Sequence, residues 1–244
     1  MATTFAELGI AFPLFEAPVD ASDYVGTANC CICQTDGVHC FPLGIGTAVM
    51  IPCSVCGVVN ALDIDSKASI RCRECGETIT FPASVVDRKE PKTCYQCLRA
   101  GKVALTKDTE FGMVSWDQAF SGVTNGIPGL QQDQFESVMI NAEEDWVGVK
   151  LPQDIMFELL RTPKYRTWQG ERWLFCCRYP MTYLGEWHHD QFNQRASDGN
   201  GESLYYAALE DVPDDTWDSL GHAVNAYVFE CKQCGRLRAH WDFD

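Results

Sequence analysis

Ten of the fourteen cysteines in this 244-residue chain occur in five pairs with the spacing C-x2-C. The pairs are Cys30/Cys33, Cys53/Cys56, Cys72/Cys75, Cys94/Cys97 and Cys231/Cys234. Two intervening residues allow a tight turn that aims both sulfurs at one metal ion. Disulfides are the alternative and require an oxidising compartment. Because the N-terminal sequence lacks the basic region of a signal peptide, we expect a cytoplasmic protein and favour zinc over disulfides.

The most regular motif contains Cys53, Cys56, Cys72 and Cys75, in the arrangement C-x2-C-x15-C-x2-C. This spacing predicts a structural zinc site of the ribbon type. We expect glycines after both pairs to allow the turn, and short strands at 58–64 and 77–82. Four cysteine ligands leave no open coordination position for a water molecule, so we expect this site to be structural rather than catalytic.

Two further pairs flank that ribbon. If residues 46–91 form a folded insertion whose ends lie close together, Cys30 and Cys33 can meet Cys94 and Cys97 at its base. Zinc requires four ligands, which favours joining the two half-sites. Cys31, His39 and Cys40 remain outside this set. They could substitute as ligands, but we expect the two cysteines to be small buried thiols.

The last pair, Cys231 and Cys234, must find its partners upstream, because no cysteine follows it. The only other cysteines in the second half of the chain are Cys176 and Cys177. Adjacent residues in a strand point to opposite faces, so both can bind one ion only where the chain bends. One of them could instead act with a histidine, or both could be core residues. A third site brings the expected total to about three zinc ions.

The chain is strongly acidic, with a formal net charge of −15. Residues 108–158 contain ten acids and one base, and residues 186–218 contain nine acids and one base. Such a surface repels phosphate backbones and suits a basic protein partner, although acidic stretches also simply confer solubility. The candidate partner-binding residues are Glu143, Glu144, Asp145, Asp211, Asp214 and Asp215.

The apolar spacing predicts helices at 152–165, 135–145 and 212–224, and strands at 181–187, 203–209 and 226–231. Trp168 follows the first helix; it could belong to a partner-binding patch, but we expect it in the core. No apolar run reaches about 18 residues, so we expect no membrane span. The predicted fold is α+β, with zinc-stapled small mixed domains and an inserted all-β zinc ribbon. The expected division is 1–45 with 92–106, the ribbon at 46–91, and an acidic region at 107–244.

The order of several motifs resembles the CbrC family of bacterial proteins. The matching elements are the outer cysteine pairs, Arg161-Thr162-Pro163, Trp168-Gln169, Cys176-Cys177 and the terminal Cys231/Cys234 with Asp242. The family carries His-Cys where this chain has Cys176-Cys177, an exchange between zinc ligands that supports the third site. The ribbon is an addition that the family usually lacks. The resemblance implies a colicin-tolerance type of protein that acts as an immunity protein.

Together these features predict a non-enzymatic, acidic zinc protein that binds and neutralises a cognate toxin, such as a basic nuclease. The alternative is a zinc-ribbon adaptor in nucleic-acid or transcription-associated complexes, for which Lys67, Arg71 and Arg73 provide a small basic cluster. An enzyme is not expected. The segment His188-His189-Asp190 has no evident catalytic partners, and the chain lacks a phosphate-binding loop, a nucleophile elbow and an HExxH motif.

Overall fold

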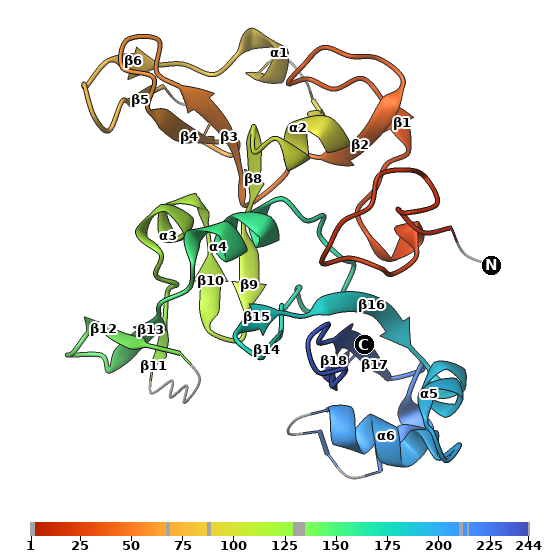
Figure 1. The fold of residues 1–244 in the computed structure, drawn as a ribbon. Coiled ribbons are helices and arrows are strands. Elements are labelled where there is room, and N and C mark those ends of the chain that lie inside the picture. Colours follow the sequence, from red (N-terminus) through yellow and green to blue (C-terminus); the bar gives the residue numbers. More distant parts are fainter. Residues whose placement is uncertain are drawn as a thin grey trace. The chain divides into compact units, whose positions relative to one another are not determined.

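A computed structural model describes residues 3–66, 69–86, 89–128, 135–209, 212–213 and 215–243 (Figure 1). Many small sheets and short helices confirm the predicted α+β class. The chain forms two compact units. Unit 1 comprises residues 1–22, 108–110 and 165–244, and unit 2 comprises residues 23–107 and 111–164. The three-part division expected from the sequence remains a prediction. No helix among the described residues is long and apolar enough to cross a membrane.

In unit 2, one sheet joins the two ends of the segment 46–91. It contains β1 (Thr27–Ala28), β2 (Val38–Pro42) and β7 (Lys92–Cys94), with β2 in the centre. The antiparallel register pairs Cys40 with Cys94, and the backbone N–H of Leu43 donates to the carbonyl of Pro91 at 2.8 Å. The ends of the intervening segment therefore lie close together. The helix α2 (Tyr95–Arg99) follows β7 directly.

The segment between them contains the expected strands. β3 (Thr47–Pro52) and β4 (Val59–Asp63) form an antiparallel pair, and β5 (Ile70–Arg71) pairs with β6 (Thr78–Ile79). A short helix, α1 (Ala83–Val86), follows. The other neighbour of β3 is β8 (Val103–Leu105), which lies outside the predicted ribbon. The ribbon thus shares a sheet with later residues of unit 2.

The remainder of unit 2 corrects one sequence prediction. The helix α4 (Gln153–Leu160) is confirmed, but the predicted helix at 135–145 is wrong. There the chain forms β12 (Ser137–Asn141), which pairs with β13 (Trp146–Val149) across a turn. Met139, which a helix would have buried, is 54% exposed. The other elements are β9 (Lys107–Thr109), β10 (Gly112–Val114), α3 (Trp116–Ser121) and β11 (Ile127–Pro128).

Unit 1 is built on the antiparallel sheet β16–β17–β18, in which β17 (Val224–Glu230) is central. β16 (Thr182–Trp187) and β17 confirm the predicted strands, and β18 (Leu237–Phe243) forms the other edge. Ala226, Val228 and Ala239 face a core completed by α5 (His189–Arg195) and α6 (Gly201–Ala208). Further elements are η1 (Val19–Ala21), β14 (Phe175–Cys176), β15 (Tyr179–Pro180) and η2 (Trp217–Ser219).

Two predictions in unit 1 are wrong. Residues 203–209, expected as a strand, lie almost entirely in α6, whose N-cap Asn200 accepts a hydrogen bond from the backbone of Ser203 at 3.0 Å. This cap satisfies an N–H at the start of the helix. The predicted helix at 212–224 is reduced, in its described residues, to the short helix η2 and the first residue of β17.

Trp168 also differs from expectation, because it is 71% exposed. The backbone N–H groups of Trp168 and Gln169 donate to one carboxylate oxygen of Asp242, at 3.0 and 3.2 Å. Asp242 is only 2% exposed. A buried carboxylate is stable where hydrogen bonds compensate its lost hydration, so these donors satisfy one oxygen of Asp242 and fix the backbone that carries the exposed indole.

Candidate metal centres

Twelve cysteines lie in three groups of four, and in each group the four sulfur atoms are within 4.8 Å of one another. The groups contain the combinations expected from the sequence. Four sulfurs at 2.3 Å from a central ion in a tetrahedron are about 3.8 Å apart. The recorded sulfur–sulfur distances, 3.5 to 3.9 Å, are close to this value. Each group could therefore hold one tetrahedral metal ion.

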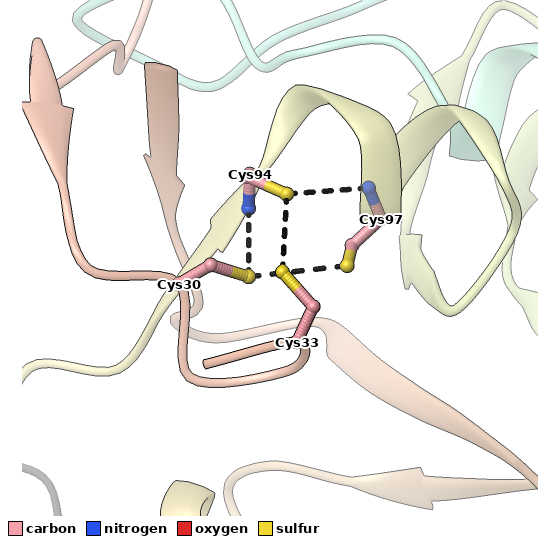
Figure 2. A group of neighbouring side chains, drawn as sticks. All are labelled: Cys30, Cys33, Cys94 and Cys97. Atoms are coloured by element: carbon pink, nitrogen blue, oxygen red, sulfur yellow. Dashed lines mark hydrogen bonds between the residues drawn. The ribbon is translucent and has the colours of Figure 1, made fainter. Parts of the chain in front are cut away.

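The first group contains Cys30, Cys33, Cys94 and Cys97, whose sulfurs point toward one another (Figure 2). The two cross-group sulfur distances are 3.7 Å for Cys33–Cys94 and 3.9 Å for Cys30–Cys97. Backbone N–H groups also point at the sulfurs: that of Cys94 donates to Cys30 at 3.2 Å, and that of Cys97 donates to Cys94 at 3.4 Å. Such donors stabilise thiolates and so favour metal binding.

Four of the five cysteine pairs share one turn. The N–H of the first cysteine donates to the carbonyl five residues later, and its own carbonyl accepts from the N–H four residues later. In each turn the residue at this fourth position has a positive φ: Gln34 (60°), Gly57 (76°), Gly76 (73°) and Gly235 (73°). Glycine adopts this conformation without steric cost. The fifth pair differs, because Cys94 is the N-cap of α2 and Cys97 lies inside the helix.

The ribbon group has two sulfur pairs at 3.5 Å, Cys53–Cys75 and Cys56–Cys72. The pKa of Cys72 is lowered to about 6 because backbone N–H groups of Cys75 and Glu74 donate to its sulfur. Asn60, which is 2% exposed, adds a side-chain N–H at 3.6 Å from the same sulfur. Sequence reasoning missed Asn60, since an asparagine in a strand carries no signal that it faces a metal ligand.

In the terminal group both adjacent cysteines take part. The sulfur of Cys176 is 3.8 Å from that of Cys177 and 3.7 Å from that of Cys234. Cys177 and Arg178 have φ values of 53° and 61°, and they form the turn between β14 and β15. This is the bend that two adjacent ligands require. The pKa of Cys234 is lowered to about 7, mainly because the backbone N–H of Arg236 donates to its sulfur.

The remaining cysteines and histidines lie outside these groups within the described residues. Cys40 is buried, its thiol lies 3.6 Å from the carbonyl of Ala28, and burial raises its pKa to about 12. His240 is hydrogen-bonded to the hydroxyl of Tyr165 at 2.6 Å. Burial, together with the charge of Arg172, lowers the pKa of His240 to about 3. His240 is therefore a neutral, buried hydrogen-bonding group rather than a fourth ligand.

The candidate partner-binding acids occur on both units. Glu143, Glu144 and Asp145 are exposed in the turn between β12 and β13 in unit 2. A hydrogen bond from the N–H of Glu143 to the side chain of Asn141, at 3.0 Å, orders this turn. Asp215 is exposed in unit 1. Asp211 and Asp214 lie outside the described residues. The exposed acids therefore form two candidate surfaces, which belong to different units.

Comparison with known proteins places the chain in a family. Residues 55–243 match a family described as "Uncharacterised protein family (UPF0167)". A 98-residue segment is 34% identical to "UPF0167 protein PA1536" of Pseudomonas aeruginosa, covering 37% of this chain and 52% of that protein. No solved structure matches. The match begins inside the ribbon, and the CbrC relationship and the inserted origin of the ribbon remain predictions. Because the matched region covers more than half of the chain, the protein belongs to the UPF0167 family.

Proposed function

We propose that each cysteine group holds a structural zinc ion, for a total of three per chain. Four thiolates in a tetrahedron select zinc or an iron–sulfur centre. The recorded sulfur–sulfur distances of 3.5–3.9 Å are those of ligands around one ion, and all four positions in each group are cysteine. Such closed sites contribute folding energy and leave no position for a substrate. This supports a structural role for the ions and a non-enzymatic protein.

Substitution of Cys231 by serine tests the terminal site. We expect the purified protein to contain about three zinc ions, one for each closed four-cysteine site, and the Cys231→Ser variant to contain one fewer. The physical reason is that three remaining thiolates bind zinc much less tightly than four. Metal content per chain, measured by plasma emission spectroscopy, checks this. A variant with an unchanged metal content would contradict the terminal site, and iron in place of zinc would contradict the choice of metal.

We propose further that the protein is an immunity protein that binds and neutralises a basic toxin. The observation that supports this most directly is the ordered turn that exposes Glu143, Glu144 and Asp145 together. Acidic groups fixed on a rigid hairpin attract a cationic partner and orient it during association. The basic active-site cleft of a nuclease toxin would be complementary to this surface. The exposed indole of Trp168 in unit 1 is a second candidate contact, since tryptophan is enriched at interface hot spots.

The adaptor hypothesis has less support, because the described arginines of the ribbon interact within the protein. The guanidinium of Arg73 lies 4.2 Å from the ring centroid of Phe120. That of Arg71 donates to the carbonyl of Gly76 at 3.2 Å. Lys67, the third base of the proposed cluster, lies outside the described residues. With a formal net charge of −15, the chain as a whole also repels nucleic acid.

Neutralising the acidic turn tests the immunity hypothesis. The binding partner used in this test is a cationic toxin encoded beside this gene. The variant carries Glu143→Gln, Glu144→Gln and Asp145→Asn. We expect its affinity to fall roughly tenfold to hundredfold, because three exposed charge pairs contribute about 0.5–1 kcal/mol each. Titration calorimetry at several salt concentrations measures this loss, which high salt should reduce.

A matched control separates the effect of the acidic turn on affinity from the effect of the net charge. The variant Glu74→Gln, Glu77→Gln, Asp154→Asn removes three exposed acids elsewhere in unit 2 and changes the net charge equally. It should retain wild-type affinity. Equal losses in both variants would show that only overall charge matters. Failure of the wild-type protein to bind or inhibit the neighbouring toxin would reject the immunity function itself.

A further inference from the structure

Unit 1 contains a cavity of about 370 Å³ near the terminal cysteine pair. Its walls come from the end of α5 and the following loop, from α6, and from the turn that leads into β18. The lining residues that matter here are Arg195, Ser197, Leu204, Ala207, Arg236 and Leu237. The volume is at the lower end of the range for small-molecule sites, about 300–1,000 Å³.

The charge of this cavity is opposite to that of the chain. Arg195 is the only base between residues 186 and 218, where nine acids occur. It nevertheless shares the cavity with Arg236, and none of the described residues that line the cavity is acidic. Both side chains are exposed to solvent, and two cationic groups on the walls of one cavity favour an anion beside them. The arrangement is therefore unexpected for a chain with a net charge of −15.

The ion pairs around the cavity compensate Arg195 but not Arg236, within the part of the chain that the structure describes. Arg195 pairs with Glu230, and this pair orients its guanidinium. Lys232 lies 2.8 Å from the other carboxylate oxygen of Glu230 and also pairs with Glu16 at 2.7 Å, so the two acids balance Arg195 and Lys232. The Arg236 side chain makes no ion pair or hydrogen bond within the part of the chain that the structure describes. A guanidinium of this kind presents a planar fork of donors that matches a carboxylate or a phosphate.

We propose that this cavity binds a small organic anion, a carboxylate or a phosphate ester with a compact apolar body. Arg195 and Arg236 contact the anionic group, and the hydroxyl of Ser197 is available as a further donor. Leu204, Ala207 and Leu237 provide an apolar wall for the rest of the ligand. Arg236 lies two residues beyond Cys234, and its backbone N–H donates to the Cys234 sulfur. The position of Arg236 therefore depends on the terminal cysteine site.

The test uses the full-length, ¹⁵N-labelled protein with inorganic phosphate and butyrate as probes, each titrated at constant ionic strength. We expect saturable shifts of the arginine Nε–H signals and of the amide signals of Ser197 and Gly235. Arg236→Ala should weaken binding of both probes at least tenfold, because one of two charged donors is lost. Arg236→Lys should recover part of the affinity, since the charge returns without the fork. Arg166→Ala is the control: Arg166 is exposed in the same unit and does not line the cavity.

A second variant tests the apolar wall without altering either arginine. Ala207→Leu should weaken butyrate binding and leave phosphate binding unchanged, because the added side chain occupies the space of the apolar body. Shifts that increase without saturation, or an Arg236→Ala variant with wild-type affinity for both probes, would overturn the proposal. Stronger saturable binding of butyrate would identify a carboxylate ligand, and stronger binding of phosphate would identify a phosphate ester.

Discussion

Replacing Cys97 with serine is expected to remove one metal ion and to unfold the region around β2, β7 and α2. Cys97 is 3% exposed, and the buried core at this point consists of Cys30, Cys40, Cys94 and Cys97 themselves. Among the described residues, Ala28, Ile32 and Val38 add partly buried apolar contacts to this cluster. Phe41 in β2 and Leu98 in α2 are also buried, but the centre of the cluster consists of the ligands themselves, so a metal bound there would supply a large part of the local stability. Structural zinc contributes about 10–16 kcal/mol in zinc-finger peptides, comparable with the total stability of a domain.

We expect the Cys97→Ser variant to melt at least about 10 °C below the wild-type protein, because each kcal/mol corresponds to roughly 2–4 °C in a domain of this size. Calorimetry gives the melting temperature, and metal analysis gives the ion count. Hydrogen exchange should show lost protection in β2 and α2. Cys40→Ser is a matched control, since Cys40 is buried in the same cluster but lies outside the four-cysteine group.

The control variant should keep its metal content and most of its stability, because a serine hydroxyl can also donate to the carbonyl of Ala28. Two results would contradict the structural role of the site. One is a Cys97→Ser variant that loses an ion yet melts at the wild-type temperature. The other is an equal loss of stability in both variants, which would attribute the effect to core packing rather than to metal binding.

The second large effect is expected from the ion pair between Arg238 and Glu110 in unit 1. The two guanidinium nitrogens donate to the two carboxylate oxygens at 3.0 and 2.8 Å. The side chains are only 12% and 11% exposed. Arg238 also donates to the carbonyl of Phe175 at 2.5 Å, and the N–H of Phe175 donates to Glu110 at 3.1 Å. The pair thus connects β18 to β14, next to the terminal cysteine site.

Arg238→Met should lower the free energy of unfolding by about 3–5 kcal/mol, because it leaves the Glu110 carboxylate buried without its counter-charge. The double variant Glu110→Gln, Arg238→Met should recover a substantial part of this loss, since the buried charge is then absent. Urea denaturation measures both changes. Lys150→Met provides the exposed comparison: its pair with Glu136 has exposures of 52% and 67%, and its loss should cost less than about 1 kcal/mol. Equal costs for Arg238→Met and Lys150→Met would show that burial does not strengthen the first pair.

Local spacing predicted much of the fold. The apolar pattern of 152–165 was sufficient for α4, and the runs at 181–187 and 226–231 were sufficient for β16 and β17. The predictions for residues 135–145 and 203–209 were wrong for a common reason. Short amphipathic runs satisfy both a helical and a strand pattern, and their state depends on a cap or on a partner strand. For residues 137–141 the partner is β13, and for residues 201–208 the cap is Asn200.

Trp168 and Asn60 show a second limit of prediction from the sequence. A tryptophan after a helix predicts burial, but the buried carboxylate of Asp242, 74 residues later in the chain, binds the backbone of Trp168 while its indole lies exposed. Asn60, in β4, donates to Cys72, which directly follows β5. Both arrangements depend on contacts between distant residues, and such contacts leave no pattern in the local sequence.

The sequence by itself predicted three cysteine groups, because the pair spacing and the need for four ligands restricted the combinations, but it left open whether Cys176 and Cys177 both join the terminal group. It also determined the acidic character of the chain. Only the tertiary structure decided how adjacent Cys176 and Cys177 reach one group, through a turn with two positive φ angles. It alone brought Arg195 and Arg236 to one cavity. The physical reason is that ligand number is a chemical property of the side chains, whereas the direction of a side chain follows from the backbone around it.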